Sequence, residues 1–126
     1  MLSKDARILI VDDMKLVRKS VIRYLTKLGY SKFIEAANGN EAVSQVRNDA
    51  VDFIFLDVVM PLLAGDDALK QIRSANSAIP VVMLTSVSDE GLIEECQKIG
   101  ITGYLLKPLR HNDGPKKLET FLSKVM

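Results

Sequence analysis

Short apolar runs alternate with amphipathic stretches along the chain, and this alternation constrains the fold more than any other feature of the sequence. The run at residues 8–11 is continuously apolar and largely β-branched, which indicates a strand buried on both faces. Strands of this kind are typical of parallel sheets that are covered by helices on each side. We predict strands at residues 8–11, 32–36, 53–56, 81–84 and 104–106.

The stretches between these runs carry apolar residues at helical spacing. In the first of them, Val17, Val21 and Leu25 lie four residues apart, and charged residues fall between them. Asn40 is placed to cap the second helix. We predict helices at residues 14–28, 40–48, 65–74, 89–99 and 115–125.

Five strands that are each followed by a helix predict an α/β fold. The expected architecture is a doubly wound, five-stranded parallel sheet with five helices on its two faces. The chain has 126 residues, the size of one ordinary domain, so we expect residues 1–126 to form a single domain.

Charge and cysteine content exclude several classes of partner. The formal net charge is +1, from 17 basic and 16 acidic residues, so we expect no direct nucleic-acid partner and no anionic membrane surface. No apolar run approaches the roughly 20 residues of a membrane helix. The single cysteine, Cys96, cannot form an internal disulfide, which favours a reducing cytoplasm. We expect a cytoplasmic protein.

Polar side chains follow four of the predicted strands. Asp12 and Asp13 follow the first strand, Asp57 the third, Thr85 the fourth and Lys107 the fifth. In doubly wound sheets the ligand site lies outside the carboxyl ends of the strands, near the point where the strand order reverses. We therefore expect these five side chains to meet at one edge of the sheet.

The chemistry of this set points to phosphoryl transfer. Three carboxylates repel one another unless a cation joins them, and oxygen ligands without His or Cys suit Mg²⁺. Together with the metal, the ammonium of Lys107 and the hydroxyl of Thr85 can neutralise a phosphoryl group in transfer. One carboxylate remains as the nucleophile, and Asp57 suits that role because it comes from an inner strand.

The same residues resemble the receiver domain of two-component response regulators, in particular the single-domain, chemotaxis-type receiver. The residues that carry the resemblance are, in chain order, Asp12, Asp13, Asp57 within the segment FLDVVMP, Thr85, Lys107 and Pro108. The resemblance implies a flavodoxin-like sheet with strand order 2-1-3-4-5. It also implies a phosphoacceptor that promotes its own phosphorylation and dephosphorylation, rather than an enzyme acting on a separate substrate. The implied phosphoryl donor is a histidine kinase or a histidine phosphotransfer protein.

The family pattern assigns a role to each matching residue. Asp57 becomes the aspartyl phosphate, and Lys107 contacts the phosphoryl group. Asp13, Asp57 and the backbone carbonyl of Val59 bind Mg²⁺ directly, whereas Asp12 acts through a bound water.

The resemblance further implies a switch. Thr85 moves toward the phosphoryl group, and Tyr104 then turns inward. The peptide bond between Lys107 and Pro108 is expected to be cis, which aims Lys107 into the site. The output surface is expected on the helix at 89–99, the strand at 104–106 and the last helix, where it binds a downstream protein that the sequence does not identify. The protein is then a monomer or a phosphorylation-dependent dimer.

The sequence departs from the family pattern at a few positions. The turn after Pro61 retains Gly65 but lacks the usual acidic residue before it, and Leu62 and Leu63 are a potential partner contact. Val59 and Val87, which flank the phosphoryl site in the family, are apolar and cannot orient an attacking water. We therefore expect slow self-dephosphorylation.

Simpler interpretations exist for each residue taken alone. Asp12 or Asp13 could cap the following helix, Asp57 could be an ordinary acid at a strand end, and Tyr104 could be a partly buried strand residue. Cys96 is expected to be an apolar core residue, and His111 a solvated loop residue.

Other functions also fit parts of the pattern. The chain could be a receiver fragment of a longer regulator whose output domain is missing, or an adaptor that uses the fold only for binding. A flavin mononucleotide protein would need a hydroxyl-rich loop after the first strand, where Asp12 and Asp13 stand. A hydrolase with an aspartate nucleophile would carry that nucleophile at the end of the first strand.

Overall fold

The fold is a five-stranded parallel sheet between two layers of helices. The computed structural model describes residues 2–58, 65–85, 90–107, 109–110 and 112–123. The strands are β1 (Arg7–Val11), β2 (Lys32–Ala36), β3 (Phe53–Asp57), β4 (Val81–Thr85) and β5 (Gly103–Leu106). The helices are α1 (Lys15–Lys27), α2 (Gly39–Asn48), α3 (Gly65–Ala75), α4 (Glu90–Ile99) and α5 (Gly114–Leu122).

The order of the strands is β2-β1-β3-β4-β5, and each neighbouring pair is parallel. This confirms the doubly wound, flavodoxin-like fold and the strand order 2-1-3-4-5. The strand order reverses between β1 and β3, which places these two strands at the centre of the carboxyl edge where a ligand site is expected.

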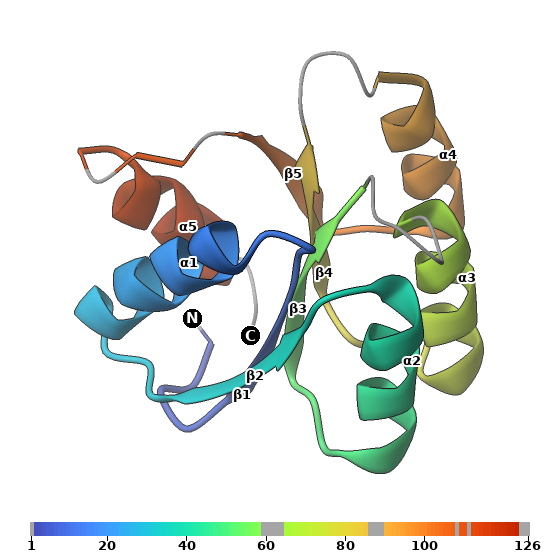
Figure 1. The fold of residues 1–126 in the computed structure, drawn as a ribbon, viewed down its shortest axis with the longest axis horizontal. Coiled ribbons are helices and arrows are strands. Elements are labelled where there is room, and N and C mark those ends of the chain that lie inside the picture. Colours follow the sequence, from blue (N-terminus) through green and yellow to red (C-terminus); the bar gives the residue numbers. More distant parts are fainter. Residues whose placement is uncertain (1, 59–64, 86–89, 108, 111, 124–126) are drawn as a thin grey trace.

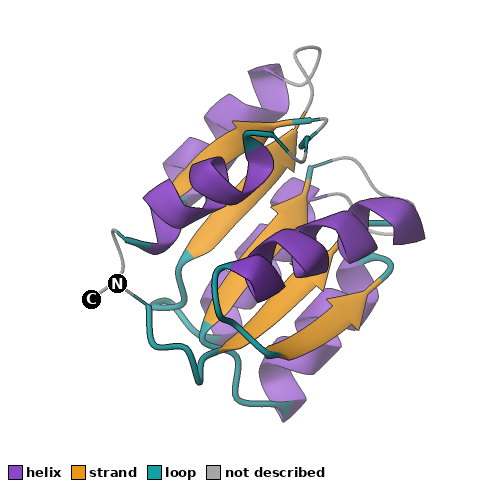
Figure 2. Ribbon diagram, turned by 90° about the vertical axis from the view of Figure 1, so that its left-hand side faces the viewer, coloured by secondary structure: helices purple, strands orange, loops and turns teal. Residues whose placement is uncertain are grey.

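The helices divide unequally between the two faces of the sheet. Helices α1 and α5 pack together on one face, while α2, α3 and α4 cover the other (Figure 1). Turned by 90°, the five strands run side by side in one direction between the two helix layers (Figure 2).

Successive side chains of each strand point to opposite faces of the sheet and so belong to two separate apolar cores. In β3, Phe53 and Phe55 belong to the core beneath α1 and α5, whereas Ile54 and Leu56 belong to the core beneath α2, α3 and α4. All four are fully buried, as the continuous apolar run predicted. We call these the α1/α5 core and the α2–α4 core.

The starts of α1, α2 and α5 each differ by one residue from the predictions. Asn38 rather than Asn40 caps α2, because the Asn38 side chain accepts a hydrogen bond from the backbone N–H of Glu41. The Glu41 carboxylate in turn accepts a hydrogen bond from the backbone N–H of Ala37. The side chains of Asn38 and Glu41 thus each accept a backbone N–H at the start of the helix, much as in a capping box. Helix α5 begins at Gly114, one residue before the predicted start, and ends at Leu122 with Ser123 as its C-cap, three residues before the predicted end.

Helix α4 packs four apolar residues against the α2–α4 core. Ile93 and Cys96 are buried, while Leu92 and Ile99 are only partly buried against the α2–α4 core. The prediction that Cys96 is a core residue is confirmed, and burial, with smaller effects from Asp66 and Glu95, raises the pKa of its thiol to about 11.

Within the described part of the chain, no helix has both the length and the apolar character needed to cross a membrane.

Candidate functional site

Three of the predicted site residues lie together at the carboxyl edge of the sheet, on the face that α1 and α5 cover. Asp12 directly follows β1, Asp57 is the last residue of β3, and Lys107 directly follows β5. Each comes two residues after a buried member of the α1/α5 core, so strand alternation directs all three to the same face. Those core residues are Ile10, Phe55 and Leu105.

Lys107 joins the two buried carboxylates. Its Nζ lies 2.8 Å from Asp12 Oδ2 and donates a hydrogen bond of 2.9 Å to Asp57 Oδ1. Asp12 is 0% exposed and Asp57 is 4% exposed, so both charges depend on protein partners rather than on bulk water.

The electrostatics follow from this burial. Burial raises the pKa of Asp57 to about 6; the hydrogen bond from Lys107 opposes this shift, and the negative charges of Asp12 and Asp13 add to it. Burial alone would lower the pKa of Lys107, but its pairing with Asp12 and Asp57 outweighs burial and raises that pKa. Lys107 is therefore charged at neutral pH and pairs with both buried carboxylates.

Asp13 completes an oxygen-lined acidic cluster. One carboxylate oxygen from each of Asp12, Asp13 and Asp57 lies within 4.8 Å of the others. Asp12 and Asp57 are buried and Asp13 is exposed, which leaves the cluster open to solvent on one side. Asp12 Oδ2 is buried and pairs with Lys107 by charge, yet it lacks a well-formed hydrogen bond to the described residues. An all-oxygen cluster with an under-bonded buried oxygen fits a hard divalent cation.

Neither aspartate after β1 is a helix cap. The N-cap of α1 is Met14, without a capping side-chain hydrogen bond, and Asp12 Oδ1 instead accepts the N–H of Met14. The simpler interpretation of Asp12 or Asp13 as a cap is therefore wrong.

A close backbone approach fixes the position of Asp57. The N–H of Gly65, the first residue of α3, donates to the carbonyl of Val58 over 2.8 Å. A Cβ at Gly65 would lie 2.5 Å from the Asp57 carbonyl oxygen and 2.7 Å from the Val58 Cα. Glycine is therefore required here for steric reasons, which accounts for its retention in a turn that otherwise departs from the family pattern.

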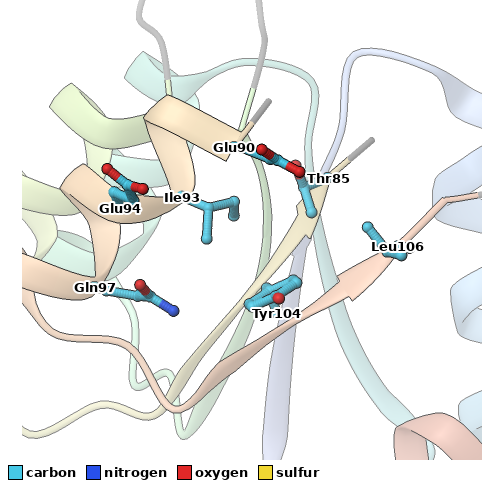
Figure 3. A pocket seen from close by; sticks show the side chains of 7 residues that line it. All are labelled: Thr85, Glu90, Ile93, Glu94, Gln97, Tyr104 and Leu106. Atoms are coloured by element: carbon cyan, nitrogen blue, oxygen red, sulfur yellow. The ribbon is translucent and has the colours of Figure 1, made fainter. Parts of the chain in front are cut away.

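Thr85 and Tyr104 lie on the opposite face of the sheet. They line a pocket of about 330 Å³ between α4, β4 and β5, together with Ile93 and Leu106 (Figure 3). Thr85 is buried at the end of β4, while Tyr104 is 43% exposed. Glu90, Glu94 and Gln97 of α4 complete the lining of this pocket.

Some predictions fall on residues that lie outside the described ones. They concern the Val59 carbonyl, the Leu62–Leu63 contact, Val87, the Lys107–Pro108 peptide bond and the solvated His111. They stay predictions.

Arg18 lies beside the site without having been predicted there. It is one of the charged residues between the apolar positions of the first helix, but its side chain is only 14% exposed and its Nη1 donates to the Asp12 carbonyl over 2.7 Å. A signal was available in the sequence, because an arginine on the first turns of α1 and Glu35 at the end of β2 are complementary charges on adjacent elements.

Comparison with known proteins decides between the interpretations of this acidic edge. A family model described as the response regulator receiver domain matches residues 8–119. The chain belongs to the response regulator receiver family. Receivers of this family are phosphoacceptors of two-component signalling, and they bind Mg²⁺ in an acidic pocket.

Several relatives resemble this receiver over nearly its whole length. The chemotaxis protein CheY-3 of Vibrio cholerae is 32% identical over 126 residues, which cover 98% of this chain and 97% of the relative. The receiver domain of the sensor histidine kinase PA1611 from Pseudomonas aeruginosa has a TM-score of 0.82 at 28% identity, covering 95% and 96% of the two chains. That structure holds a magnesium ion in its active-site cleft.

A third structure shows a receiver with a partner. It is CheY from Borrelia burgdorferi in a complex with CheX, BeF3 and magnesium, with a TM-score of 0.85 to this receiver at 28% identity. The alignment covers 95% of this chain and 88% of the other. That structure therefore shows a CheY receiver bound to another protein, CheX.

Proposed function

We propose that Asp57 accepts a phosphoryl group, in a Mg²⁺-dependent transfer from a histidine kinase or a histidine phosphotransfer protein. The observation that carries this proposal is the buried Asp57 carboxylate, held by Lys107 beside the acidic cluster at the centre of the sheet edge. A carboxylate with a pKa of about 6 is mostly ionised near neutral pH, and a nearby cation favours that nucleophilic form further.

The other residues of the edge act on the transferred group. Asp13, Asp57 and the backbone carbonyl of Val59 would hold Mg²⁺ directly, and Asp12 would hold it through water. When bound, the metal supplies positive charge that offsets the phosphoryl oxygens. Lys107 would exchange its contact with the Asp57 carboxylate for one with a phosphoryl oxygen while it keeps Asp12, because an ammonium has three donors.

We propose that phosphorylation changes the conformation of residues on the other face of the sheet, which α4 covers. Thr85 would move toward the phosphoryl group with its hydroxyl, and the Tyr104 ring would then enter the pocket beside Ile93. The exposure of Tyr104 and the open pocket of about 330 Å³ support this, because the ring has room to move inward. The surface of α4, β5 and α5 would change shape and so bind a downstream protein.

Charge on this surface bears on the oligomeric state. Glu90, Glu94 and Glu95 lie on α4, and Lys116 and Lys117 lie at the start of α5. Two copies in opposite orientation could pair these groups, and we propose that the protein is a monomer or a phosphorylation-dependent dimer. Size-exclusion chromatography with and without BeF3 and Mg²⁺ tests this, and an unchanged elution volume would contradict dimerisation.

The adaptor and fragment hypotheses make different predictions. An adaptor that only binds partners does not need a lysine joined to two buried carboxylates, so the geometry favours an acceptor. We propose that residues 1–126 constitute the receiver unit, in which all phosphoryl chemistry takes place, whether or not an output domain accompanies it.

A direct test uses acetyl phosphate and Mg²⁺ with intact mass measurement. We expect the wild type to gain one phosphoryl group, and Asp57→Asn to gain none because the nucleophilic carboxylate is gone. The Thr85→Val variant should still accept the phosphoryl group. In NMR spectra, however, its phosphorylation should no longer change the chemical shifts of Tyr104. An absence of mass gain in the wild type at saturating Mg²⁺ would refute the proposal.

A further inference from the structure

Arg18 ties the strand-end loop that carries Asp12 and Asp13 to the neighbouring strand β2. Its Nη1 donates to the Asp12 carbonyl over 2.7 Å, and its Nε donates to Glu35 Oε1 over 3.0 Å. One planar guanidinium thus bridges a backbone carbonyl at the acidic cluster and a carboxylate on β2. With its side chain only 14% exposed, Arg18 makes these bonds largely shielded from water.

Glu35 is itself held firmly. Lys19 Nζ donates to Glu35 Oε2 over 2.7 Å, and the hydrogen bond from Lys19, aided by Arg18, lowers the pKa of Glu35. Glu35 therefore stays ionised and also balances the charge of the guanidinium. That balance matters because an uncompensated cation close to Asp12 and Asp13 would oppose the binding of Mg²⁺.

Hydrogen bonds hold the backbone of Asp12 at both its N–H and its carbonyl group. Its N–H donates to the carbonyl of Ala36 on β2 over 3.1 Å, and its carbonyl accepts from Arg18. Its side chain accepts the Met14 N–H with one oxygen and pairs with Lys107 through the other. Since the Asp12 carbonyl belongs to the peptide that leads to Asp13, the Arg18 bond also fixes the start of the exposed ligand.

We propose that Arg18 is a positioning residue for the divalent-cation site, acting through the Asp12–Asp13 peptide and oriented by Glu35. This inference rests on the proposed function, because it assigns a role toward the same Mg²⁺ site. The Arg18 side chain donates to the Asp12 carbonyl and to Glu35, so it would act through the ligands and not as one of them. It would reduce the motion of Asp12 and Asp13, which must lie close together to hold the ion. Ligands that are already in position lose less conformational freedom when the ion binds.

The chemistry of the bridge makes arginine specific at this position. Lysine has a single ammonium on a flexible chain and cannot reproduce the planar fork between a carbonyl and a carboxylate. Arg18→Lys should therefore behave much like Arg18→Gln. Lys19 offers a matched control, because it pairs with the same Glu35 but has no contact with the Asp12 peptide among the described hydrogen bonds and ion pairs.

The test is a Mg²⁺ titration followed by the amide signals of Asp12 and Asp13 in NMR spectra. We expect Arg18→Gln and Arg18→Lys to weaken Mg²⁺ affinity about tenfold, the lower range for losing a partner that orients a metal ligand. Lys19→Gln should change the affinity less than about twofold, because a half-exposed ion pair contributes little. Equal affinities in the wild type and both Arg18 variants, or an equal loss in Lys19→Gln, would overturn the inference.

A kinetic readout separates positioning from a merely structural role. With acetyl phosphate as donor, the Mg²⁺ concentration for half-maximal phosphorylation should rise in the Arg18 variants, while the rate at saturating Mg²⁺ returns to that of the wild type. A lower plateau without a shift in Mg²⁺ dependence would overturn the inference. If the wild type itself neither binds Mg²⁺ nor takes up phosphate, the proposed function fails instead, so the two failures are distinguishable.

Discussion

Lys107 donates a hydrogen bond of 2.9 Å to Asp57, across fifty positions of the sequence and two strand boundaries of the sheet. The same ammonium also pairs with Asp12, so one cation offsets two carboxylates that have almost no access to water. This ammonium offsets only part of the negative charge of the acidic cluster, so gathering these carboxylates costs folding free energy. Substitutions in and around the site should therefore have measurable effects.

Asp57→Asn should stabilise the metal-free protein at neutral pH. The folded-state pKa of about 6 lies above the ordinary value of 3.8, so the folded protein binds this proton more tightly than the unfolded chain does. The stability contributed by Asp57 is therefore fully present below about pH 4 and is lost as the pH rises through 6. We expect the free energy of unfolding of Asp57→Asn, measured with urea near pH 7.5, to exceed that of the wild type by about 2 kcal/mol.

The difference should shrink as the pH is lowered toward about 4.5, because the wild-type carboxyl then becomes protonated. Added Mg²⁺ should also shrink it by stabilising the ionised wild-type site. A difference that is independent of pH would contradict the raised pKa of Asp57.

Lys107→Ala should destabilise the protein at neutral pH. It leaves the buried carboxylates of Asp12 and Asp57 without their cation, and breaking a buried pair on one side costs roughly 3 kcal/mol. Lys98→Ala is the control, because its pair with Glu95 is exposed and should change stability by less than about 0.5 kcal/mol. Urea unfolding measures both, and Mg²⁺ should restore part of the Lys107→Ala loss. Equal effects of the two substitutions would count against the central role of Lys107.

Gly65→Ala and Gly91→Ala should act in opposite directions. At Gly65 the new methyl group would meet the backbone of Asp57 and Val58, so we expect a loss of about 1–3 kcal/mol from overpacking together with slower phosphorylation. At Gly91, within α4, a Cβ would meet nothing within 4 Å. We expect a gain of about 0.5–1 kcal/mol there, because alanine loses less backbone freedom in a helix. Thermal unfolding compares them, and a neutral Gly65→Ala would show that the α3 start can move away from Asp57.

Val59→Asn should shorten the lifetime of the aspartyl phosphate. An amide at this position can orient an attacking water by hydrogen bonding, which the isopropyl group of valine cannot do. The decay of phosphoprotein after removal of acetyl phosphate, followed by intact mass, measures the lifetime. An unchanged decay rate would mean that residue 59 does not limit access of water to the phosphoryl group.

Much of this site was predictable because it depends on topology. Apolar runs that are buried on both faces set the strand positions, and strand order then brings Asp12, Asp57 and Lys107 to one edge regardless of their distance in sequence. The observed strand ends differ from the predicted ends by no more than one residue, since short apolar runs of this kind are typical of strands that a parallel sheet buries on both faces.

The remainder depends on contacts between elements that no local pattern contains. Asn38 caps α2 because Glu41 reaches back to Ala37, which distinguishes it from the equally suitable Asn40. The Arg18–Glu35 bridge exists because β1 and β2 are neighbours in the sheet. Ile93 is buried in the α2–α4 core where α4 packs beside α3, a contact that helical periodicity alone does not fix.

The sheet also separates two kinds of residue. Asp12, Asp57 and Lys107 stand on the face of α1 and α5, whereas Thr85 and Tyr104 stand on the face of α4, with two independent apolar cores between the helices and the strands. The sheet therefore keeps the two groups of residues physically apart. On the proposed function, substitutions around the α4 pocket would change which protein binds the phosphorylated receiver, while the carboxylates and the lysine that handle the phosphoryl group stay in place.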